Sequence, residues 1–384
     1  MHDDVVVIGG GPAGSKVAAL LSKDYDVTVL EEHAVSGLPI QCTGLITQRV
    51  VELSGVKPNI LNTLYGANVH FPNGGVISAR SGKPKAVLID RSDLDMRLAY
   101  VAQDAGAKYV YSERYTSHKI ENNSVIILAE SGKEYNSRMI IGADGQNSKV
   151  SMSLHDNFPK EYVRGIQVDI KYEMNDQSMI DICLGSEIAP GFFSWKIPFG
   201  EYTRVGLCTT WSAGPPVDFL KVLLKRTGLE DKEVIAKVCG KIPIGGRRKT
   251  YGDNLLLIGD AAGQVKPVSG GGLYPSFMIA PCLRETIDEA FTSNIFTSNK
   301  LSSYEKRWKK VVGKELKRGY KLRNMYGNLS DEDLNKAYGV IDREDIRHAL
   351  NDIDIDSPSK MVPVIMRNFP VAMKMLPIML KSLI

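Results

Sequence analysis

A glycine-rich turn near the start of the chain has the residue types and spacing that bind a nucleotide phosphate. Residues 5–14 read VVVIGGGPAG, an apolar strand pattern followed by GxGxxG, and a helical apolar pattern comes next. A second apolar run then ends at the acids Glu31 and Glu32. Glycines at these places allow a tight turn, the approach of a pyrophosphate and close helix packing, while the acid accepts ribose hydroxyls. The helix N-terminus offers free N–H groups to the phosphate. We therefore predict nucleotide contacts, to FAD or NAD alike, by Gly9, Gly11, Pro12, Ala13, Gly14 and Glu31, with Glu32 as the second choice of acid.

Two later segments repeat the pattern of a buried strand that ends in small residues and an acid. Residues 138–150 read RMIIGADGQNSKV, and residues 252–272 read GDNLLLIGDAAGQVKPVSGGG. A helix is expected from Leu273, directly after the glycine triplet. The acid of the first segment, Asp144, has two interpretations, a place near the cofactor or a cap of the turn. No second GxGxxG occurs, so the sequence indicates no separate NAD(P) domain.

The order of these three motifs resembles that of the large FAD flavoprotein family typified by the aromatic hydroxylases. The resemblance covers residues 1–290 and implies FAD as the cofactor, with Gly259 and Asp260 at the ribityl or ribose hydroxyls. A helix N-terminus at the pyrimidine edge of the flavin stabilises the anionic reduced form. The resemblance implies backbone N–H contacts to that edge from Gly270, Gly271, Gly272 and Leu273. Arg91, in the segment IDRSDLD, matches the family's flavin-contacting arginine. The alternative is a solvated arginine at a helix start.

An aromatic strip lies at residues 190–200, which read PGFFSWKIPFG. Alternation puts Phe193, Trp195 and Ile197 on one face of a predicted strand, either as ordinary core or as the wall of a substrate site. The strip resembles the PxxYxWxFP strand of the geranylgeranyl reductases, a branch of these flavoproteins that reduces isoprenoid double bonds. Phe193 and Ile197 replace the tyrosine and phenylalanine of that pattern. The resemblance implies that the three side chains bind an isoprenoid chain. In the reductase hypothesis given below, the face of Trp195 would stabilise positive charge on a tertiary carbon.

A cysteine follows the ribose acid in a loop that this branch places near the flavin ring. Many members read CGEGL there, whereas this chain reads CTGL from Cys42, one residue shorter. The resemblance implies that Cys42 and Gly44 lie beside the flavin and that Cys42 guides or protonates the substrate. The alternative is that Cys42 is a small buried pocket residue.

The composition limits the other classes of function. Of the 384 residues, 43% are hydrophobic and 24% charged, and the net charge of +4 is too small to indicate a nucleic-acid partner. The five cysteines form no CxxC, so neither a disulfide framework nor a metal site is expected, and a reducing cytosol fits. The first apolar run is a strand pattern rather than a signal peptide, and no run approaches the ~20 apolar residues of a membrane span.

These motifs predict the fold class and the division of the chain. We expect an α/β protein with a Rossmann-like FAD-binding domain, an inserted antiparallel-sheet substrate domain and a helical C-terminal region. The FAD-binding domain is expected to be discontinuous, over residues 1–150 and 250–295. The substrate domain is expected at residues 151–249, and the helical region at residues 296–384.

Several segments outside the motifs are assigned by pattern alone. Residues 160–210 and 236–250 are expected to supply the strands of the substrate sheet, and residues 216–235 a helix. A basic helix is expected from Leu301 to Arg323, either docked by its apolar stripe or bound to an anionic membrane. Seven-residue units near the C-terminus would cover a lipid tunnel, contact the membrane interface or pack on the protein itself. They begin at Pro363, Pro370 and Pro377.

The hypothesis that combines these patterns is an FAD-dependent reductase that saturates C=C bonds in geranylgeranyl chains of archaeal-type membrane lipids. It needs an external electron donor, ferredoxin, NAD(P)H or another carrier. It places the protein in the cytoplasm, with a peripheral contact on the membrane as an option. The alternatives are an FAD-dependent monooxygenase of an aromatic or polyene substrate, a lipid carrier with structural FAD, and an electron-transfer flavoprotein dehydrogenase. The last usually carries a cluster-binding set of cysteines, which is not seen in this sequence.

Overall fold

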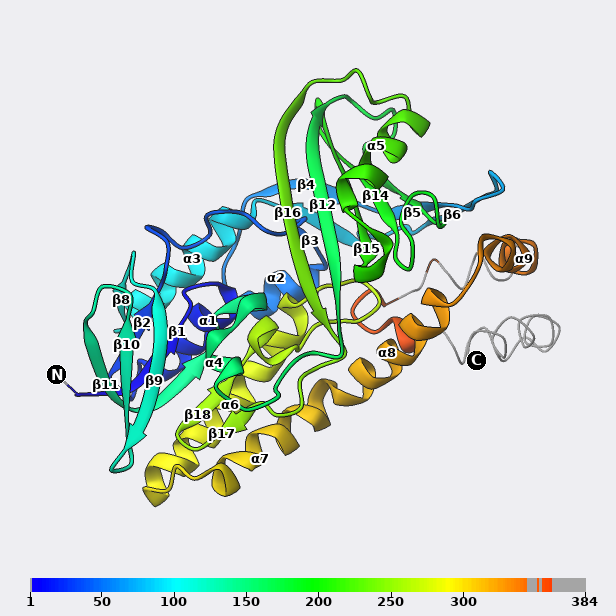
Figure 1. The fold of residues 1–384 in the computed structure, drawn as a ribbon. Coiled ribbons are helices and arrows are strands. Elements are labelled where there is room, and N and C mark those ends of the chain that lie inside the picture. Colours follow the sequence, from blue (N-terminus) through cyan, green and yellow to red (C-terminus); the bar gives the residue numbers. More distant parts are fainter. Residues whose placement is uncertain (1, 344–350, 352–353, 361–384) are drawn as a thin grey trace.

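The computed structural model describes residues 2–343, 351 and 354–360. Figure 1 shows two large sheets toward opposite ends of the molecule, with a long helical run beside both of them. That run consists of α7 (Ser298–Trp308), a π-helical turn (Lys309–Gly313) and α8 (Lys314–Gly327).

The first sheet contains the parallel core that the N-terminal motifs predict. Its parallel strands follow the order β18, β11, β1, β2, β8, and β17, β10 and β9 extend it in antiparallel pairings. Val5 and Val7 pack into one buried cluster, while Val6 and Ile8 pack into another. Both faces are covered, which explains why β1 is apolar at consecutive positions. The strands are β1 (His2–Ile8), β2 (Val27–Leu30), β8 (Lys108–Val110), β9 (Tyr115–Glu121), β10 (Ser124–Ala129), β11 (Glu134–Gly142), β17 (Tyr251–Gly252) and β18 (Leu255–Leu257).

Helices cover one face of this sheet, and each of them begins at a residue that the sequence predicts to contact the cofactor. The helices are α1 (Pro12–Leu21), α3 (Arg91–Asp104) and α6 (Leu273–Ser293). Asp90 caps α3 by accepting hydrogen bonds from the N–H groups of Ser92 and Asp93, so Arg91 is placed at the first helical position. Two short helical segments, α4 (Lys149–Met152) and a 3₁₀ turn (Gly259–Ala262), follow β11 and β18.

The second sheet has the order β16, β12, β15, β14, β13, β5, β6. It is antiparallel except where β13 pairs in parallel with β5. Its strands are β5 (Gly66–His70), β6 (Val76–Arg80), β12 (Glu161–Lys171), β13 (Met179–Cys183), β14 (Ser194–Phe199), β15 (Tyr202–Thr210) and β16 (Val234–Ile244). The strands expected within residues 160–210 and 236–250 are present. β5 and β6 come from earlier in the chain, inside the segment assigned to the FAD-binding domain. The proposed division into domains stays a prediction.

A buried carboxylate joins three strands of the second sheet. Asp181 on β13 lies 2.8 Å from the ammonium of Lys196 on β14 and accepts a hydrogen bond from Asn68 on β5 at 3.0 Å. The ring of His70 lies 3.5 Å from the same carboxylate. Burial alone would raise the pKa of Asp181, but the hydrogen bonds from His70, Lys196 and Asn68 hold it well below its ordinary value.

The strands of a small third sheet lie between β2 and β8 in the chain. This sheet pairs β3 (Leu45–Ile46), β7 (Ala86–Ile89) and β4 (Ile60–Leu64), with α2 (Gln48–Ser54) following β3. The remaining helices are α5 (Pro216–Arg226) and α9 (Asp331–Ile341). None of the helices within the described residues combines the length and apolar character that a bilayer crossing requires.

Two segments differ from the pattern-based expectations. The helix expected at residues 216–235 ends at Arg226, because Gly228 adopts a left-handed conformation (φ 64°) and β16 begins at Val234. The expected basic helix exists but is longer, since α7, the π turn and α8 follow one another from residue 298 to residue 327. The C-terminal units that begin at Pro363, Pro370 and Pro377 lie outside the described residues.

Candidate functional site

The first glycine turn leaves an open approach to the start of α1. A Cβ on Gly14 would overlap the carbonyl oxygen of Gly9, and one on Gly9 would lie 2.5 Å from the carbonyl oxygen of Ala143. By contrast, a Cβ on Gly11 would meet nothing within 4 Å. Gly11 is the N-cap of α1 and provides no side-chain cap, and Pro12 follows at the first helical position. The turn is therefore closed on the protein side and open where a pyrophosphate would bind, so the residues fit a dinucleotide.

The two acids after β2 occupy different environments. Glu31 is 7% exposed, and its carboxylate accepts hydrogen bonds from the N–H of Gly10 at 2.6 Å and from that of His33 at 2.9 Å. Glu32 is exposed and forms an ion pair with Arg114 at 2.7 Å. The carboxylate of Glu31 faces the glycine turn, whereas that of Glu32 is engaged at the surface. This arrangement favours Glu31 as the ribose ligand, which stays a prediction.

Asp144 of the second motif forms the bonds of a turn cap. Its carboxylate accepts a hydrogen bond from the hydroxyl of Ser148 at 2.6 Å and one from the N–H of Val150 at 3.2 Å. Burial raises the pKa of Asp144 above its ordinary value. The backbone of this motif also packs against Gly9. The ADG segment thus shapes the turn by its backbone, while its acid binds Ser148, the N-cap of α4, and the N–H of Val150.

The third motif brings Asp260 and the glycine triplet to the same place. A Cβ on Gly259 would lie 3.0 Å from the Cβ of Ala13, so the GDAA turn contacts the start of α1. A Cβ on Gly272 would lie 2.7 Å from a carboxylate oxygen of Asp260. Burial raises the pKa of Asp260, and the positive charges of Arg91 and Arg247 oppose that rise. The three motifs, far apart in the sequence, therefore meet around the N-termini of α1 and α6.

Arg91 and Cys42 lie together beside this cluster. The guanidinium of Arg91 forms two hydrogen bonds with Asp95, at 2.9 and 3.0 Å, and its side chain is 10% exposed. Burial opposes its charge, but Asp95 and Cys42 raise the pKa of Arg91 further above its ordinary value. Its Nε is buried and has no hydrogen-bond partner within the described residues. Arg91 is therefore not the solvated arginine of the alternative interpretation, and it has a donor available for a ligand.

The cysteine loop is half-buried and follows the strand of the ribose acid. The N–H of Gly44 donates to the sulfur of Cys42 at 3.4 Å, and a Cβ on Gly44 would lie 3.5 Å from Cγ of Arg91. Gly44 has φ 79°, a conformation that glycine adopts without strain. The structure thus brings the predicted residues Cys42, Gly44 and Arg91 together.

The aromatic strip begins just before β14 and continues along it. The rings of Phe193 and Trp195 meet edge to face with centroids 6.2 Å apart, and the indole of Trp195 lies against Gly206 on β15. Both side chains are partly buried, and the indole N–H has no partner within the described residues. Ile197 is fully buried with Leu64 and Leu88. Phe193 and Trp195 can therefore form an accessible wall, while Ile197 packs in the core behind it.

The glycine triplet connects the nucleotide motifs with the aromatic strip. A Cβ on Gly270 would lie 2.8 Å from the side chain of Ile242 and 3.9 Å from the ring of Phe192. Phe192 stacks on Phe193 with centroids 4.7 Å apart. On its other side the triplet contacts Asp260, through Gly272. A flavin edge held by this triplet would thus lie close to the aromatic wall.

Two basic residues at this junction were not identified from the sequence. Arg247 acts electrostatically on Asp260 and donates a hydrogen bond to the carbonyl of Asn157 at 2.8 Å. Lys266, 8% exposed, lies beneath Gly271 and pairs with Asp356 at 2.8 Å. Arg247 lies outside the motifs, and Lys266, although inside the segment 252–272, was given no role there, since each reaches the site only through the path of its loop.

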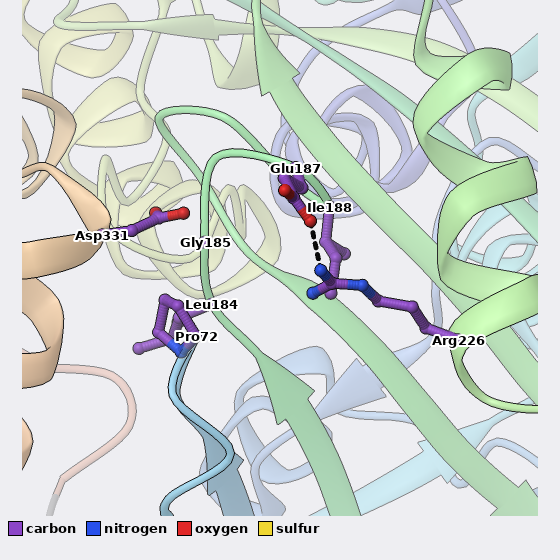
Figure 2. A pocket seen from close by; sticks show the side chains of 7 residues that line it. All are labelled: Pro72, Leu184, Gly185, Glu187, Ile188, Arg226 and Asp331. Atoms are coloured by element: carbon purple, nitrogen blue, oxygen red, sulfur yellow. Dashed lines mark hydrogen bonds and ion pairs between the residues drawn. The ribbon is translucent and has the colours of Figure 1, made fainter.

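A separate hollow lies away from these residues, between the second sheet and α9. Figure 2 shows its charged lining, in which the guanidinium of Arg226 pairs with Glu187 while Asp331 lies across from them. Asp331 also accepts hydrogen bonds from Ser186. These charges already have partners in the protein, and no residue of the nucleotide motifs lines the hollow.

The fold and the convergent motifs define a Rossmann-like flavoprotein. Residues 4–350 match the family model described as lycopene cyclase protein. Digeranylgeranylglycerophospholipid reductase 2 of Methanopyrus kandleri is 30% identical over 94% of this chain and 96% of its own. The chain therefore belongs to the geranylgeranyl reductase family of flavoproteins, and the resemblance drawn from its motifs is confirmed.

Solved structures share the fold at lower identity. A geranylgeranyl bacteriochlorophyll reductase-like protein from Thermoplasma acidophilum is 23% identical, with a TM-score of 0.84, and the match covers 98% of this chain and 99% of that one. The halogenase PltM, solved with phloroglucinol and FAD, is 15% identical with a TM-score of 0.70, and covers 97% of this chain and 85% of its own. The predicted α/β flavoprotein fold is thus confirmed.

Proposed function

We propose that this protein is an FAD-dependent oxidoreductase that saturates C=C bonds in the geranylgeranyl chains of a polar membrane lipid. The observation that carries the proposal is the position of the glycine triplet, which contacts Asp260 on one side and the aromatic cluster of Phe192 on the other. This arrangement would put the edge of a bound flavin next to an apolar wall. The reductase names among the relatives of this chain support the same reaction.

The nucleotide motifs account for the binding of FAD. The free N–H groups at the start of α1 would hold the pyrophosphate, and the carboxylate of Glu31 would accept a ribose hydroxyl. Asp260 would bind the ribityl or ribose hydroxyls of the flavin half. Arg91 would direct its unpartnered Nε–H to the flavin, while the N–H groups from Gly270 to Leu273 would face its pyrimidine edge.

The aromatic wall would hold the substrate without offering it a charge. Bound FAD, once reduced by an external donor such as ferredoxin or NAD(P)H, supplies a hydride to one carbon of the alkene. Phe193 and Trp195 would align the isoprenoid chain and keep water from it, with Ile197 supporting them from the core. The face of the Trp195 indole would stabilise positive charge that develops on the tertiary carbon.

The second alkene carbon needs a proton, and Cys42 is the group that we assign to hold it. Its sulfur is half-buried and lies within reach of the electrostatic influence of Arg91. The positive charge of Arg91 would stabilise the thiolate that remains after the proton leaves. The sulfur would then regain a proton from solvent, so that one hydride and one proton convert C=C into CH–CH.

The test is product formation under nitrogen. The FAD-loaded protein is incubated with dithionite and a digeranylgeranyl phospholipid in D₂O, and the lipid is analysed by mass spectrometry. The proposal predicts two added hydrogen atoms for each saturated bond, with at least one of them deuterium. Unchanged lipid under nitrogen, together with oxygen incorporation after air is admitted, would contradict the reductase and favour a monooxygenase.

The proposal includes a peripheral contact with anionic lipid, through the helical run of α7 and α8. Eight of the nine basic residues between Leu301 and Arg323 fall into two groups, and Arg318, which is also exposed, belongs to neither. Arg307, Lys309 and Arg323 pair with Glu289, Glu305 and Glu161. A second group is exposed and recurs at intervals of three or four residues, which places it on one face: Lys306, Lys310, Lys314, Lys317 and Lys321. Trp308 and Val312 are buried against the protein, so this face is turned outward and suits an anionic bilayer.

A further inference from the structure

The cysteine loop is held from the second sheet by a buried glutamine. The side-chain N–H of Gln167 donates to the carbonyl of Cys42 at 3.3 Å, and its side-chain oxygen accepts from the hydroxyl of Thr43 at 3.0 Å. Gln167 is 6% exposed and lies on β12 opposite Gly206. Gly206 is also the partner of Trp195, so the amide and the indole share one face of the sheet.

An arginine on β15 holds the next peptide of the same loop. The guanidinium of Arg204 donates to the carbonyl of Thr43 at 2.5 Å and forms two hydrogen bonds with Asp169, at 2.7 and 2.8 Å. The same guanidinium lies 5.3 Å from the centre of the Phe199 ring. Arg204 and Asp169 are largely buried, with side chains 11% and 14% exposed. A planar guanidinium held by a bidentate pair has little freedom to move, so its third contact is fixed in direction.

The far side of the loop is attached to the flavin motifs instead. The carbonyl of Gly44 accepts a hydrogen bond from the N–H of Ile89, two residues before Arg91. The loop is distant in sequence from its partners in the second sheet. In the chain, 125 positions separate Cys42 from Gln167, and 161 separate Thr43 from Arg204. The loop therefore bridges the sheet that carries Trp195 and the helix start that carries Arg91.

We propose that Gln167 and Arg204 are positioning residues that hold the sulfur of Cys42 at a set place between Trp195 and the flavin site. A buried ion pair such as Arg204 with Asp169 is weak evidence for stability, because apolar residues of similar volume often serve as well. A role in orientation explains why the pair also contacts Thr43. The expected effect on turnover rests on the proposed function. The contacts of Gln167 and Arg204 with the loop, and the reactivity of the Cys42 sulfur, can be tested without it.

The test measures the alkylation of Cys42 in the FAD-loaded protein. Iodoacetamide is added in a Cys239→Ser background, because Cys239 is the exposed cysteine among the five, and the Cys42 peptide is quantified over time by mass spectrometry. Gln167→Leu removes both contacts of the glutamine. Arg204→Lys keeps a positive charge beside Asp169, but its single nitrogen cannot reach the three positions that the three guanidinium nitrogens fill. If either variant fails to fold, Gln167→Glu replaces it, since it keeps the acceptor for Thr43 and loses the donor to Cys42.

Arg164→Lys is the matched control. Arg164 lies on the same strand, β12, and also donates to backbone carbonyls, those of Trp211 and Gly214, but it points to the opposite face. We call Gln167 and Arg204 together the clamp, and variants at these two positions the clamp variants. We expect alkylation of Cys42 to rise about tenfold in the clamp variants, the change that a loss of ~1.4 kcal/mol produces. The control should stay within about twofold of the parent. A rise below about threefold in the clamp variants, or an equal rise in the control, would overturn the proposal.

Turnover gives a second readout. If the clamp acts through Cys42, the effects of Arg204→Lys and Cys42→Ser on lipid reduction should be non-additive in a double-mutant cycle. Additive effects would contradict a positioning role through Cys42. The two proposals fail separately, because a protein that does not reduce the lipid but shows the alkylation change retains the clamp and loses only the reductase assignment.

Discussion

The role of Trp195 can be separated into packing and electrostatics by two substitutions. Trp195→Leu keeps an apolar side chain but removes the π face, whereas Trp195→Phe keeps a smaller π face. The indole lies against Gly206 and meets Phe193 edge to face, so both substitutions leave space at the same place. A difference between the two variants therefore reports the aromatic face rather than the lost volume.

The expected magnitude follows from the burial of the site. An aromatic face contributes about 0.5–1 kcal/mol to a nearby cation when exposed and about 2 kcal/mol or more when desolvated. Trp195 is half-buried and its indole nitrogen is shielded, so the upper value applies. We expect Trp195→Leu to lower the rate of lipid reduction about 30-fold, which corresponds to about 2 kcal/mol of transition-state stabilisation. Trp195→Phe should retain most of the rate.

The assay is single-turnover reduction of a digeranylgeranyl phospholipid by the prereduced protein. FAD content and visible spectrum should be unchanged in both variants, since Trp195 belongs to none of the nucleotide motifs. Trp211→Leu, the same change at a tryptophan that is 55% exposed beyond the end of β15, is the control and should lower the rate little. Equal rates for the leucine and phenylalanine variants would refute the electrostatic role, and an unchanged rate in both would refute any contact with substrate.

Three further predictions concern the cofactor, stability and the membrane. Gly11→Ala should leave thermal unfolding of the FAD-free protein unchanged, because the new Cβ meets nothing within 4 Å, but should weaken FAD binding, measured by fluorescence titration. Retained FAD affinity would contradict the pyrophosphate site. Asp181 has a lowered pKa in the folded protein, so its stabilising effect should be complete above its unfolded pKa of about 3.9 and be lost progressively as pH falls from that value through the lower folded pKa. Urea unfolding should therefore show Asp181→Asn less stable than the parent at pH 6, with the gap starting to narrow only as pH falls below about 4; a gap independent of pH would disprove this linkage. Replacing Lys310, Lys314 and Lys317 by glutamine should weaken sedimentation with phosphatidylglycerol vesicles on the order of 100-fold at low salt, at ~1 kcal/mol per lysine. The same three changes at Lys119, Lys221 and Lys225, exposed elsewhere, serve as the control, and an equal loss there would contradict a specific face.

The sequence was most informative where a local pattern has a single physical cause. The apolar run of β1 and the glycines after it predict a buried parallel strand and a phosphate turn without any knowledge of distant contacts. Gly14 illustrates this, because only a residue without a side chain can lie against the carbonyl of Gly9. Alternation likewise placed Trp195 and Ile197 on one face of a strand. It could not show that Ile197 packs in the core while Trp195 remains partly accessible, because that depends on Leu64 and Leu88 from another sheet.

Contacts between distant segments were outside the reach of the sequence patterns. Gln167 and Arg204 are ordinary polar residues of two strands, and their importance appears only when the sheet brings them to the cysteine loop. The same holds for Arg247, which reaches Asp260 through the path of its loop. The helix expected at residues 216–235 was too long because apolar periodicity continued past Gly228, where the backbone turns left-handed.

The most direct test of the central claim is the anaerobic reoxidation of the reduced protein by its lipid. The flavin is reduced with one equivalent of dithionite, a digeranylgeranyl phospholipid is added without oxygen, and the flavin absorbance is followed by stopped flow. If the flavin reduces the lipid, full reoxidation is expected, with one saturated double bond formed for each flavin. A flavin that stays reduced until oxygen is admitted, with the lipid unchanged, would contradict it.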